Sequence, residues 1–373
     1  MSKAADLANL IGNINAGGGG VNRNAIINGS MNVAQRGTSS TGIGASSGYF
    51  VCDRWLFGRE AGTEQARFTI TQDTASVGID SLPFQEAGIR TALKVDVTTA
   101  ESAVAAGESS SIMQRIEGFN CSNFDIKTKP ITLSFYAKSD AKTGIMCASL
   151  YASSGARHHV KEYSITTDWQ RFSLTFPADS GATAIANDNT NELQVNFVLT
   201  AGSNLQVTGD QWAGGFDIAT SNQINFADST DNNWYLTGVQ LEVGQNPTEF
   251  EREPFERTLA KCQRYFEKSN EMTTSPQGSN ASGPYISISS DNSGNACWSI
   301  EYKVRKRADP TQTWYADNGT EGQWGYYKSG ASLTYNTVNS HRQNEHATNS
   351  YMQVGGNNIV TTVFGNWKAD AEL

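Results

Sequence analysis

Residues 193–199 read Leu-Gln-Val-Asn-Phe-Val-Leu, and this stretch indicates the fold class. Its apolar side chains recur at every second position: Leu193, Val195, Phe197 and Leu199. Successive side chains of a β-strand point to opposite faces. A period of two therefore predicts a strand with one face buried in a core.

The same two-residue period appears in rows on both sides of this stretch. Gly, Asn, Ser and Asp turns separate the rows, and no strong helix lies between them, which is typical of antiparallel strands. Eight or so such strands predict an all-β fold, most simply a jelly-roll β-sandwich. The other rows are Phe68 and Ile70; Leu93, Val95 and Val97; Ile131, Leu133 and Phe135; Phe172, Leu174 and Phe176; and Val239, Leu241 and Val243.

A short connecting helix and a smaller β-domain are predicted after the sandwich. Pro254 suits a first helical turn, and a helical apolar stripe runs through residues 253–268. Residues 269–283 are rich in Ser, Thr, Asn, Pro and Gly and are expected to be a linker. The period of two then resumes, so residues 284–373 are expected to form a C-terminal β-domain. The stripe is Phe255, Leu259, Cys262 and Phe266.

Residues 1–48 are expected to be an extended N-terminal segment outside the sandwich, which would occupy residues 49–252. A short apolar stripe precedes a glycine run at residues 17–20, which would act as a hinge. Residues 38–47 are expected to be a loop. The stripe fits either a frayed terminus or a docking segment that orders against a partner. Its members are Leu7, Leu10, Ile11 and Ile14.

The charge balance bears on partners. The chain has 373 residues, of which 28 are Lys or Arg and 37 are Asp or Glu, giving a net charge of −9. An acidic chain of low charge density argues against a general nucleic-acid binder. No apolar run approaches the roughly 18 residues of a membrane span, and no secretory signal is expected at the start.

The cysteines are five in number and widely spaced, without a Cys-x-x-Cys pair. Neither a disulfide framework nor a zinc ribbon is therefore expected. Free thiols in a protein made in a reducing compartment fit this pattern. They are Cys52, Cys121, Cys147, Cys262 and Cys297.

The sequence nominates no catalytic set, so no enzyme is expected. The glycine run lacks the lysine of a phosphate loop. His158 and His159 are neighbours that would point to opposite faces of a strand, and we interpret them as surface residues. His341 and His346 share a polar loop with Arg342, but no third metal ligand is evident.

Three carboxylates flank the last strand of the predicted sandwich: Asp228, Asp231 and Glu242. Calcium prefers hard oxygen ligands, so these residues could hold a structural calcium ion. A solvated Asp/Asn turn is the alternative interpretation. No other cofactor is expected.

Aromatic residues divide into two groups. Trp55, Trp169 and Trp234 adjoin strand patterns and are expected in the core. The aromatic residues of the C-terminal domain are denser than a small core needs, and they alternate with polar loops. Aromatic faces pack against the apolar faces of sugars, so we predict a glycan or receptor site there, with packing in the core or at a trimer axis as the alternative. The candidates are Trp314, Tyr315, Trp324, Tyr326, Tyr327, His341, Arg342 and His346.

Several stretches together resemble tail-fibre and related appendage proteins of tailed bacteriophages. The resemblance covers most of the chain and is specific to phage structural proteins, but not to one position in the virion. The stretches are Asn-Gly-Ser-Met-Asn-Val-Ala-Gln-Arg-Gly at 28–37, Asp-Arg-Trp at 53–55, Trp-Tyr-Leu-Thr-Gly-Val-Gln-Leu-Glu-Val-Gly at 234–244, Pro-Thr-Glu-Phe-Glu at 247–251, Leu-Ala-Lys-Cys-Gln-Arg-Tyr-Phe-Glu-Lys at 259–268 and Trp-Lys-Ala-Asp-Ala-Glu-Leu at 367–373.

This resemblance implies a structural virion protein assembled in the bacterial cytoplasm. Its middle region would be a jelly roll like a carbohydrate-binding module. The N-terminal stripe would dock on a phage tail or head protein, and the β-domains of a homotrimer would bind a host surface glycan or receptor, without nucleic acid or membrane insertion. A repetitive shaft is missing, so a short tail fibre fits best. A head fibre or capsid decoration protein, or a polysaccharide-degrading tailspike, remains the alternative.

Overall fold

The computed structural model describes residues 3–5, 7, 8, 11, 22–60, 65–74, 84–272, 274–277, 283–328 and 332–373. Strands make up 45% of the described residues and helices 7%, so the all-β prediction is confirmed. Within the described ranges, no helix combines the length and apolarity needed to cross a bilayer. The described part of residues 3–11 is helical, and Leu7 and Ile11 are exposed there. Leu10 and Ile14 of the predicted docking stripe lie outside the described residues.

Residue contacts divide the chain into two compact units. The first contains Met1–Val33 and Thr38–Pro254, and the second contains Ala34–Gly37 and Phe255–Leu373. The predicted connecting helix therefore belongs to the second unit. Most of the described residues between 22 and 48 belong to the first unit, with the predicted sandwich.

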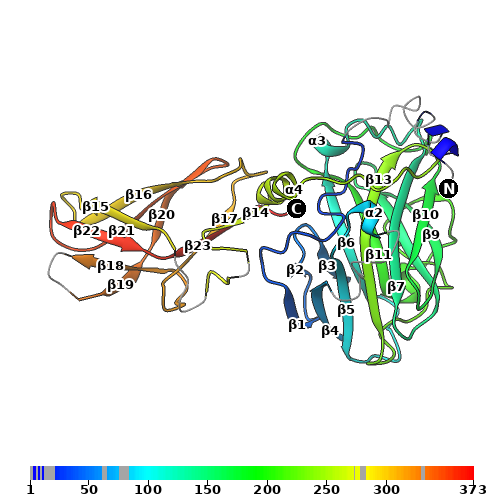
Figure 1. Ribbon diagram of the computed structural model, residues 1–373, viewed down its shortest axis with the longest axis horizontal. Coiled ribbons are helices and arrows are strands. Elements are labelled where there is room, and N and C mark those ends of the chain that lie inside the picture. The colour runs from blue at the N-terminus through cyan, green and yellow to red at the C-terminus, as the bar shows by residue number, and fades with distance from the viewer. Residues whose placement is uncertain are drawn as a thin grey trace. The chain divides into compact units, whose positions relative to one another are not determined.

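The first unit contains a six-stranded antiparallel sheet (Figure 1). Five of its strands carry the alternating rows recognised in the sequence. The sixth, β1, lies in residues expected to form a loop, and that expectation is wrong. β1 is a polar edge strand, SSTGI, whose exposed side chains leave no apolar alternation to detect. In order across the sheet, the strands are β1 (Ser39–Ile43), β4 (Arg67–Asp73), β5 (Ala92–Thr99), β13 (Asn233–Val243), β7 (Ile131–Ser139) and β10 (Gln170–Phe176).

A seven-stranded antiparallel sheet forms the other layer of the first unit. Of its seven strands, only β11 contains one of the alternating apolar rows recognised in the sequence. The neighbouring β6 reads SSSIMQRIE and is buried along almost its whole length, so its pattern does not alternate. In order, the strands are β12 (Trp212–Gly214), β9 (Arg157–Ile165), β8 (Gly144–Ala152), β11 (Asn191–Ala201), β6 (Ser109–Glu117), β3 (Leu56–Glu60) and β2 (Gly48–Tyr49).

Aromatic side chains join the two sheets across the core. Phe197 of the seven-stranded sheet packs edge-on against Phe135 of the six-stranded sheet, with ring centroids 4.9 Å apart. Phe57 of the seven-stranded sheet and Phe68 of the six-stranded sheet form a second contact between the layers, with tilted rings whose centroids are 5.4 Å apart. Burying each of these side chains contributes roughly 2–3 kcal/mol to folding. The sandwich is therefore held by the alternating apolar positions that the sequence displays.

Short helices accompany the sandwich. α2 (Phe84–Ala87) brings Phe84 against Tyr136 and Trp169, with ring centroids 5.0 and 5.1 Å apart. Trp169 is thus partly buried, whereas Trp55 and Trp234 are fully in the core, as predicted. The remaining two are α3 (Gly118–Cys121) and a 3-10 helix, η1 (Ser203–Leu205).

The side chain of Asn28 organises the start of the sandwich. Its amide nitrogen donates to the carbonyls of Val33 (2.8 Å) and Asp53 (3.1 Å), and its oxygen accepts from the Val33 amide (3.0 Å). The Asn28 carbonyl accepts from the Trp55 indole at 3.1 Å. Asn28 has φ of 59°, a left-handed conformation that Asn tolerates better than most residues. Residues 28–37 and 53–55, two of the stretches that carry the resemblance, therefore meet at this buried side chain.

The second unit begins with one helix, α4 (Phe255–Gln263). The predicted helix continued to residue 268, and that extension is wrong. Phe266 is drawn instead into a strand, β14 (Phe266–Lys268), where it pairs with Asp370. Three small antiparallel sheets follow. Their strands are β14, β23 (Asn366–Asp370) and β17 (Thr311–Tyr315); β15 (Tyr285–Ser289), β22 (Val360–Phe364), β18 (Gln323–Lys328) and β19 (Thr334–Thr337); and β16 (Asn295–Glu301), β21 (Ala347–Gln353) and β20 (Asn339–Gln343).

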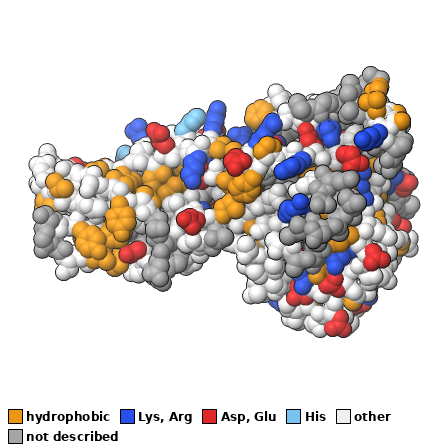
Figure 2. All heavy atoms as spheres, in the orientation of Figure 1, with side chains coloured by type: hydrophobic (Ala, Val, Ile, Leu, Met, Phe, Trp, Pro, Cys, Tyr) orange, Lys and Arg blue, Asp and Glu red, His pale blue; other side chains and the backbone are white. Residues whose placement is uncertain are grey.

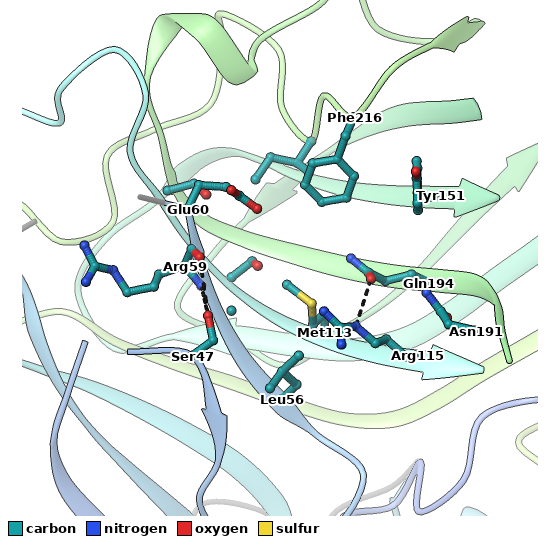
Figure 3. A pocket seen from close by; sticks show the side chains of 14 residues that line it. Ser47, Leu56, Arg59, Glu60, Met113, Arg115, Tyr151, Asn191, Gln194 and Phe216 are labelled. Carbon is teal, nitrogen blue, oxygen red and sulfur yellow. Dashed lines mark hydrogen bonds between the residues drawn. The ribbon is translucent and has the colours of Figure 1, made fainter. Parts of the chain in front are cut away.

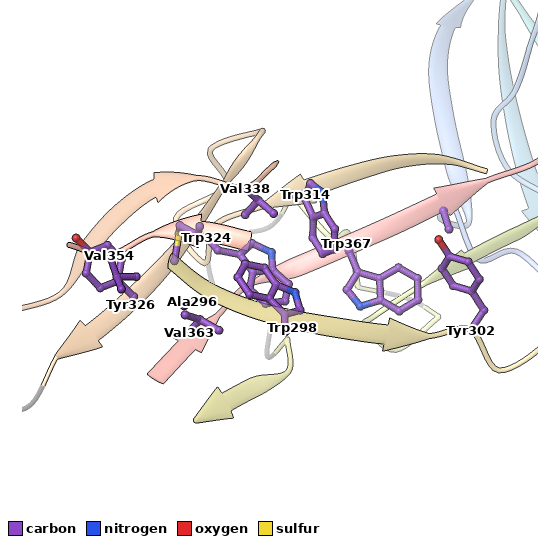
Figure 4. Close-up of a cluster of buried hydrophobic side chains, with 12 residues drawn as sticks. Ala296, Trp298, Tyr302, Trp314, Trp324, Tyr326, Val338, Val354, Val363 and Trp367 are labelled. Carbon is purple, nitrogen blue, oxygen red and sulfur yellow. The ribbon is translucent and has the colours of Figure 1, made fainter. Parts of the chain in front are cut away.

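Tryptophan rings form the core of the second unit (Figure 4). Trp298 stacks on Trp324 with centroids 4.9 Å apart, and Trp314 meets Trp324 edge-on at 5.2 Å. The Trp324 indole donates to the Asn366 carbonyl at 3.0 Å. Large rings let this small unit bury enough apolar surface to hold its thin sheets together.

A four-residue segment from near the N-terminus is part of the second unit. The Gln35 amide donates to the Phe266 carbonyl at 2.8 Å. The Arg36 guanidinium lies 3.7 Å from the centroid of the Phe266 ring and within 3.3 Å of the carboxylates of Asp370 and Glu372. The second unit is therefore built from two segments that are distant in sequence.

A fully buried ion pair lies in the same unit. Lys306 contacts Glu267, and both side chains are inaccessible to solvent. The Lys306 ammonium also donates to the carbonyls of Gln263 and Val304. Burial lowers the pKa of Lys306, and the Glu267 carboxylate opposes that effect. Removing one partner of such a pair strongly destabilises the folded state, because the other charge is left buried alone.

His158 and His159 are buried, so their interpretation as surface residues is wrong. They lie within β9, where the His159 ring packs against Phe176 and Trp212 at 5.2 and 5.3 Å between centroids. Burial, followed by the charge of Lys161, lowers the pKa of His159 to about 4.

Replacing Asn28 by Ala should lower the free energy of unfolding by about 3 kcal/mol, because three buried hydrogen bonds are lost and Ala is strained at this φ. Urea denaturation followed by tryptophan fluorescence measures the loss. The control is Asn187→Ala at an exposed position, which should change stability by less than about 0.5 kcal/mol. Equal effects of the two substitutions would contradict the role given to Asn28.

His159 should make the chain less stable as the pH falls from about 6.5 to about 4. Its pKa is about 4 in the folded chain and near 6.5 when unfolded, so the unfolded state binds more protons in this window. This stabilisation should be fully present above the window and should be lost across it, by up to about 1.4 kcal/mol per pH unit. Urea midpoints of wild type and His159→Gln across this range measure the slope, which should be shallower in the variant. Parallel slopes would contradict the assignment.

Candidate functional site

A hollow of about 310 Å³ lies on the face of the seven-stranded sheet that points away from the core. Val195 and Phe197 of β11 point into the core, so Gln194 and Asn196 point to the other face, here called the outer face. We call this hollow the trough (Figure 3). It is lined by Ser47, Leu56, Gly58, Arg59, Glu60, Ser109, Ser111, Met113, Arg115, Tyr151, Asn191, Gln194, Phe216 and Ile218.

Two aromatic rings stand at one side of the trough. Tyr151 of β8 and Phe216, from the segment after β12, meet edge-on with centroids 5.0 Å apart. Both are half-buried, so each ring keeps part of its surface open. The segment that carries Phe216 is anchored by Ile218, which packs with Cys147 and Val198 on the outer face.

A row of hydrogen-bonded polar side chains crosses the floor beside the aromatic rings. The Arg115 guanidinium donates to the Gln194 oxygen at 3.4 Å, and the Gln194 amide donates to the Asn196 oxygen at 2.6 Å. The Asn196 amide donates in turn to the Ser149 hydroxyl at 2.9 Å. Gln194 and Asn196 are almost fully buried, so these bonds fix their orientation.

The opposite side of the trough is formed by β3 and the turn before β2. Ser47 and Arg59 are tied together, since the Arg59 amide donates to the Ser47 hydroxyl at 3.0 Å. Gly58 leaves room for Met113: a Cβ at this position would come within 2.0 Å of the Met113 methyl carbon. Glycine here allows the thioether to form part of the floor.

The trough thus combines partly open aromatic rings, fixed amides and the Arg115 guanidinium in one concave site. Apolar ring faces next to oriented donors and acceptors suit a ligand with alternating C–H and hydroxyl surfaces. Among the described residues that line it, Glu60 is the one carboxylate.

The C-terminal residues predicted to bind a glycan fall into a buried group and an exposed group in the structure. Trp314, Tyr315, Trp324 and Tyr326 are all buried, with Trp324 at 0% exposure. The prediction that these rings are open to a sugar is therefore wrong, and packing in the core was the correct alternative. Their abundance reflects how much apolar area a small unit must bury.

The other predicted C-terminal residues do lie on the surface. Tyr327 is 42% exposed on β18. His341 and Arg342 are exposed on β20, and His346 is exposed in the turn before β21. His341 approaches the Tyr351 ring, with centroids 6.3 Å apart. On the face shown in Figure 2, hydrophobic side chains also reach the surface of this unit, among acidic and basic ones.

The predicted calcium ligands are not brought together. Asp231 precedes β13, which begins at Asn233, and Glu242 lies near its far end, about 30 Å from that start at roughly 3.3 Å per residue. Asp228 pairs with Lys142, and Glu242 is buried and accepts from the Thr248 amide at 2.8 Å. Among the described residues, no group of three or more His, Cys, Asp or Glu side chains could hold a metal ion. The calcium set is therefore contradicted.

Sequence inspection did not identify the trough residues. A weak signal was present in residues 109–115, where Ser, Ser, Met and Arg alternate with Ser, Ile and Gln. In β11 the polar members of the alternation are Gln194 and Asn196. They are buried and hydrogen-bonded to side chains of neighbouring strands, which the sequence pattern alone does not indicate.

Comparison with known proteins gives structural neighbours only. No family model matches the chain, and no curated protein matches its sequence. Among similar solved structures is a family 11 carbohydrate-binding module from Clostridium thermocellum, in complex with a β-1,3-1,4-mixed-linked tetrasaccharide. It has 11% identity over 57% of this chain and 98% of that chain, with a TM-score of 0.28.

Two further neighbours have the same level of similarity. The CBM22-1 xylan-binding domain from Paenibacillus barcinonensis Xyn10C has 9% identity over 58% of this chain and 94% of that one, with a TM-score of 0.27. The enzymatically active domain of tailspike protein 4 of bacteriophage CBA120 has 12% identity over 59% of this chain, with a TM-score of 0.30, but only 21% of that chain is covered. TM-scores this low carry no functional inference from these proteins to this chain.

Proposed function

We propose that the trough binds a glycan on a bacterial surface and that the chain serves as a short tail fibre or related appendage of a tailed bacteriophage. The observation that supports binding most strongly is the hydrogen-bonded row from Arg115 through Gln194 to Asn196, beside the rings of Tyr151 and Phe216.

The polar row suits a glycan because its members are ordered before a ligand arrives. Gln194 and Asn196 are held by neighbours on adjacent strands, so little side-chain entropy remains to be lost on binding. Amide and guanidinium groups can satisfy the paired hydroxyls of a sugar ring, while Tyr151 and Phe216 cover its C–H face.

The charged groups at the trough are few. The Arg115 guanidinium donates to Gln194 beside the aromatic rings, where it can also donate to hydroxyl or carboxylate oxygens of a sugar. Glu60 is the carboxylate among the described residues that line the trough. The proposal covers binding and does not include an enzymatic step.

The role as a virion appendage rests on the sequence resemblance. In this proposal the chain forms a homotrimer and attaches to the virion through its N-terminal residues. One shallow site would bind weakly, and several copies on one particle would convert weak binding into firm attachment through their effective concentration.

A head fibre or decoration protein would carry the same fold but need not adsorb to cells. The position of the chain in a virion reconstruction separates a head location from a tail location. A tailspike enzyme would release soluble sugar from host polysaccharide.

Tyr151→Ala should weaken glycan binding at least about tenfold, because a ring that covers one sugar face is removed. The measurement is an array of bacterial surface polysaccharides probed with the full chain, followed by calorimetry on the best binder. The matched control is Tyr285→Ala, since Tyr285 is 68% exposed and belongs to the second unit. Full affinity in the Tyr151→Ala variant, or no polysaccharide bound by the wild-type chain, would contradict the proposal.

A further inference from the structure

A second hollow, of about 600 Å³, lies on the sheet formed by β16, β21 and β20 in the second unit. Its side-chain lining comes from all three strands and from the turn before β16. The residues that the argument uses are Asn295, Cys297, Ser299, His341, Asn349 and Tyr351.

The strand register places these side chains on one face. Cys297 pairs with Tyr351, and Ser299 pairs with Asn349, so each pair projects to the same side of the sheet. Trp298, between Cys297 and Ser299, points to the opposite side, where it stacks on Trp324 in the core. The hollow therefore lies on the surface that faces away from the tryptophan core.

An irregularity in β20 brings His341 to this face. The pairing of β20 with β21 shifts between Ser340 and Arg342, which leaves His341 as an extra residue opposite β21. Such a bulge redirects the side chains that follow it. The imidazole consequently lies near the Tyr351 ring, with centroids 6.3 Å apart and planes nearly perpendicular.

The lining has a definite chemical character. Tyr351 and His341 offer ring surfaces, and Asn295, Asn349 and Ser299 offer uncharged donors and acceptors. The described residues that line the hollow include no Lys or Arg. The one carboxylate, Asp291, is engaged in its own turn, where it accepts from the backbone amides of Ser293 and Asn295 at 2.8 and 2.9 Å.

From this arrangement we propose that the hollow is a second saccharide site, selective for an uncharged sugar unit that rests on Tyr351 and is hydrogen-bonded by Asn349 and Ser299. The inference builds on the proposed function of the first unit. Because the trough carries the Arg115 guanidinium and the described lining of the hollow includes none, the two sites differ in the charge of the sugar they accept. One chain then engages two units of a heteropolysaccharide, which raises its avidity without a further contact.

Cys297 provides a reporter inside the hollow. It is exposed, whereas Cys52, Cys121, Cys147 and Cys262 are buried. A sugar bound on Tyr351 would cover the thiol across the strand pair and slow its alkylation. Partial burial and the nearby Asp291 raise the pKa of the Cys297 thiol, so the reaction is followed at mildly alkaline pH.

The experiment measures the rate at which a maleimide alkylates Cys297 in the full chain. The probes are D-glucose, D-galactose, N-acetyl-D-glucosamine and L-rhamnose, each at about 100 mM, well above a millimolar Kd. The expected result is a saturable slowing of at least threefold by one of these sugars. D-glucuronate at the same concentration should slow the reaction less.

Three variants locate the effect. Tyr151→Ala in the trough should leave the protection intact, while Tyr351→Ala and the milder Asn349→Ala should abolish or weaken it. Asn349 is exposed, so its replacement tests the site without risk to the core.

The outcomes separate this inference from the proposed function. Polysaccharide binding by the wild-type chain with no protection of Cys297 by any of the four sugars overturns the second site and leaves the trough intact. Protection that persists in both Tyr351→Ala and Asn349→Ala also overturns it. If the wild-type chain binds no polysaccharide through the trough but a sugar still protects Cys297, only the function proposed for the first unit is overturned.

Discussion

The amide of Asn28 holds together two parts of the chain on which the first unit depends. It ties Val33 to Asp53 through buried hydrogen bonds, and the Asn28 carbonyl receives the Trp55 indole. Trp55 then packs toward Phe197 at the centre of the sandwich, with centroids 6.2 Å apart. A residue with a short side-chain amide that tolerates a left-handed backbone is required here, and few residues other than Asn meet both conditions.

The seven-stranded sheet has two faces with different tasks. Its inner face carries the apolar side chains that bury against the six-stranded sheet, as in the pair of Phe197 and Phe135. Its outer face carries Gln194 and Asn196, which are buried yet polar. Each buried polar group needs a partner, and the neighbouring strands supply Arg115 and Ser149. The requirement to satisfy these groups is also what orders a surface able to recognise hydroxyl groups.

The sequence predicted what depends on simple alternation. The rows at 93–97, 131–135, 172–176, 193–199 and 239–243 became β5, β7, β10, β11 and β13. Strands without such alternation were missed for physical reasons. β1 is a polar edge strand, and β6 is buried on both faces. The helix prediction ran past Gln263 because Phe266 continued the apolar spacing, although tertiary pairing with Asp370 placed it in a strand.

The functional prediction placed glycan binding in the aromatic residues of the C-terminal region. Aromatic density alone does not distinguish a binding surface from a core, and Trp314 and Trp324 illustrate this, since they pack against each other. The trough depends on side chains from β3, β6, β8 and β11, which are far apart in sequence. His341, at the bulge of β20, was nominated from the sequence and lies in a hollow lined by described residues.

Under the proposed function, the most direct test of the central claim is an adsorption competition between the chain and the phage proposed to carry it, on bacteria that this phage infects. Full-length wild-type chain, or the Arg115→Ala variant, is added to cells before phage, with folding of both verified by circular dichroism. Our account predicts that wild-type chain reduces phage adsorption in a saturable manner and that the variant competes much more weakly. Equal competition by both chains, or no competition by folded wild-type chain, would contradict the claim that the trough mediates attachment.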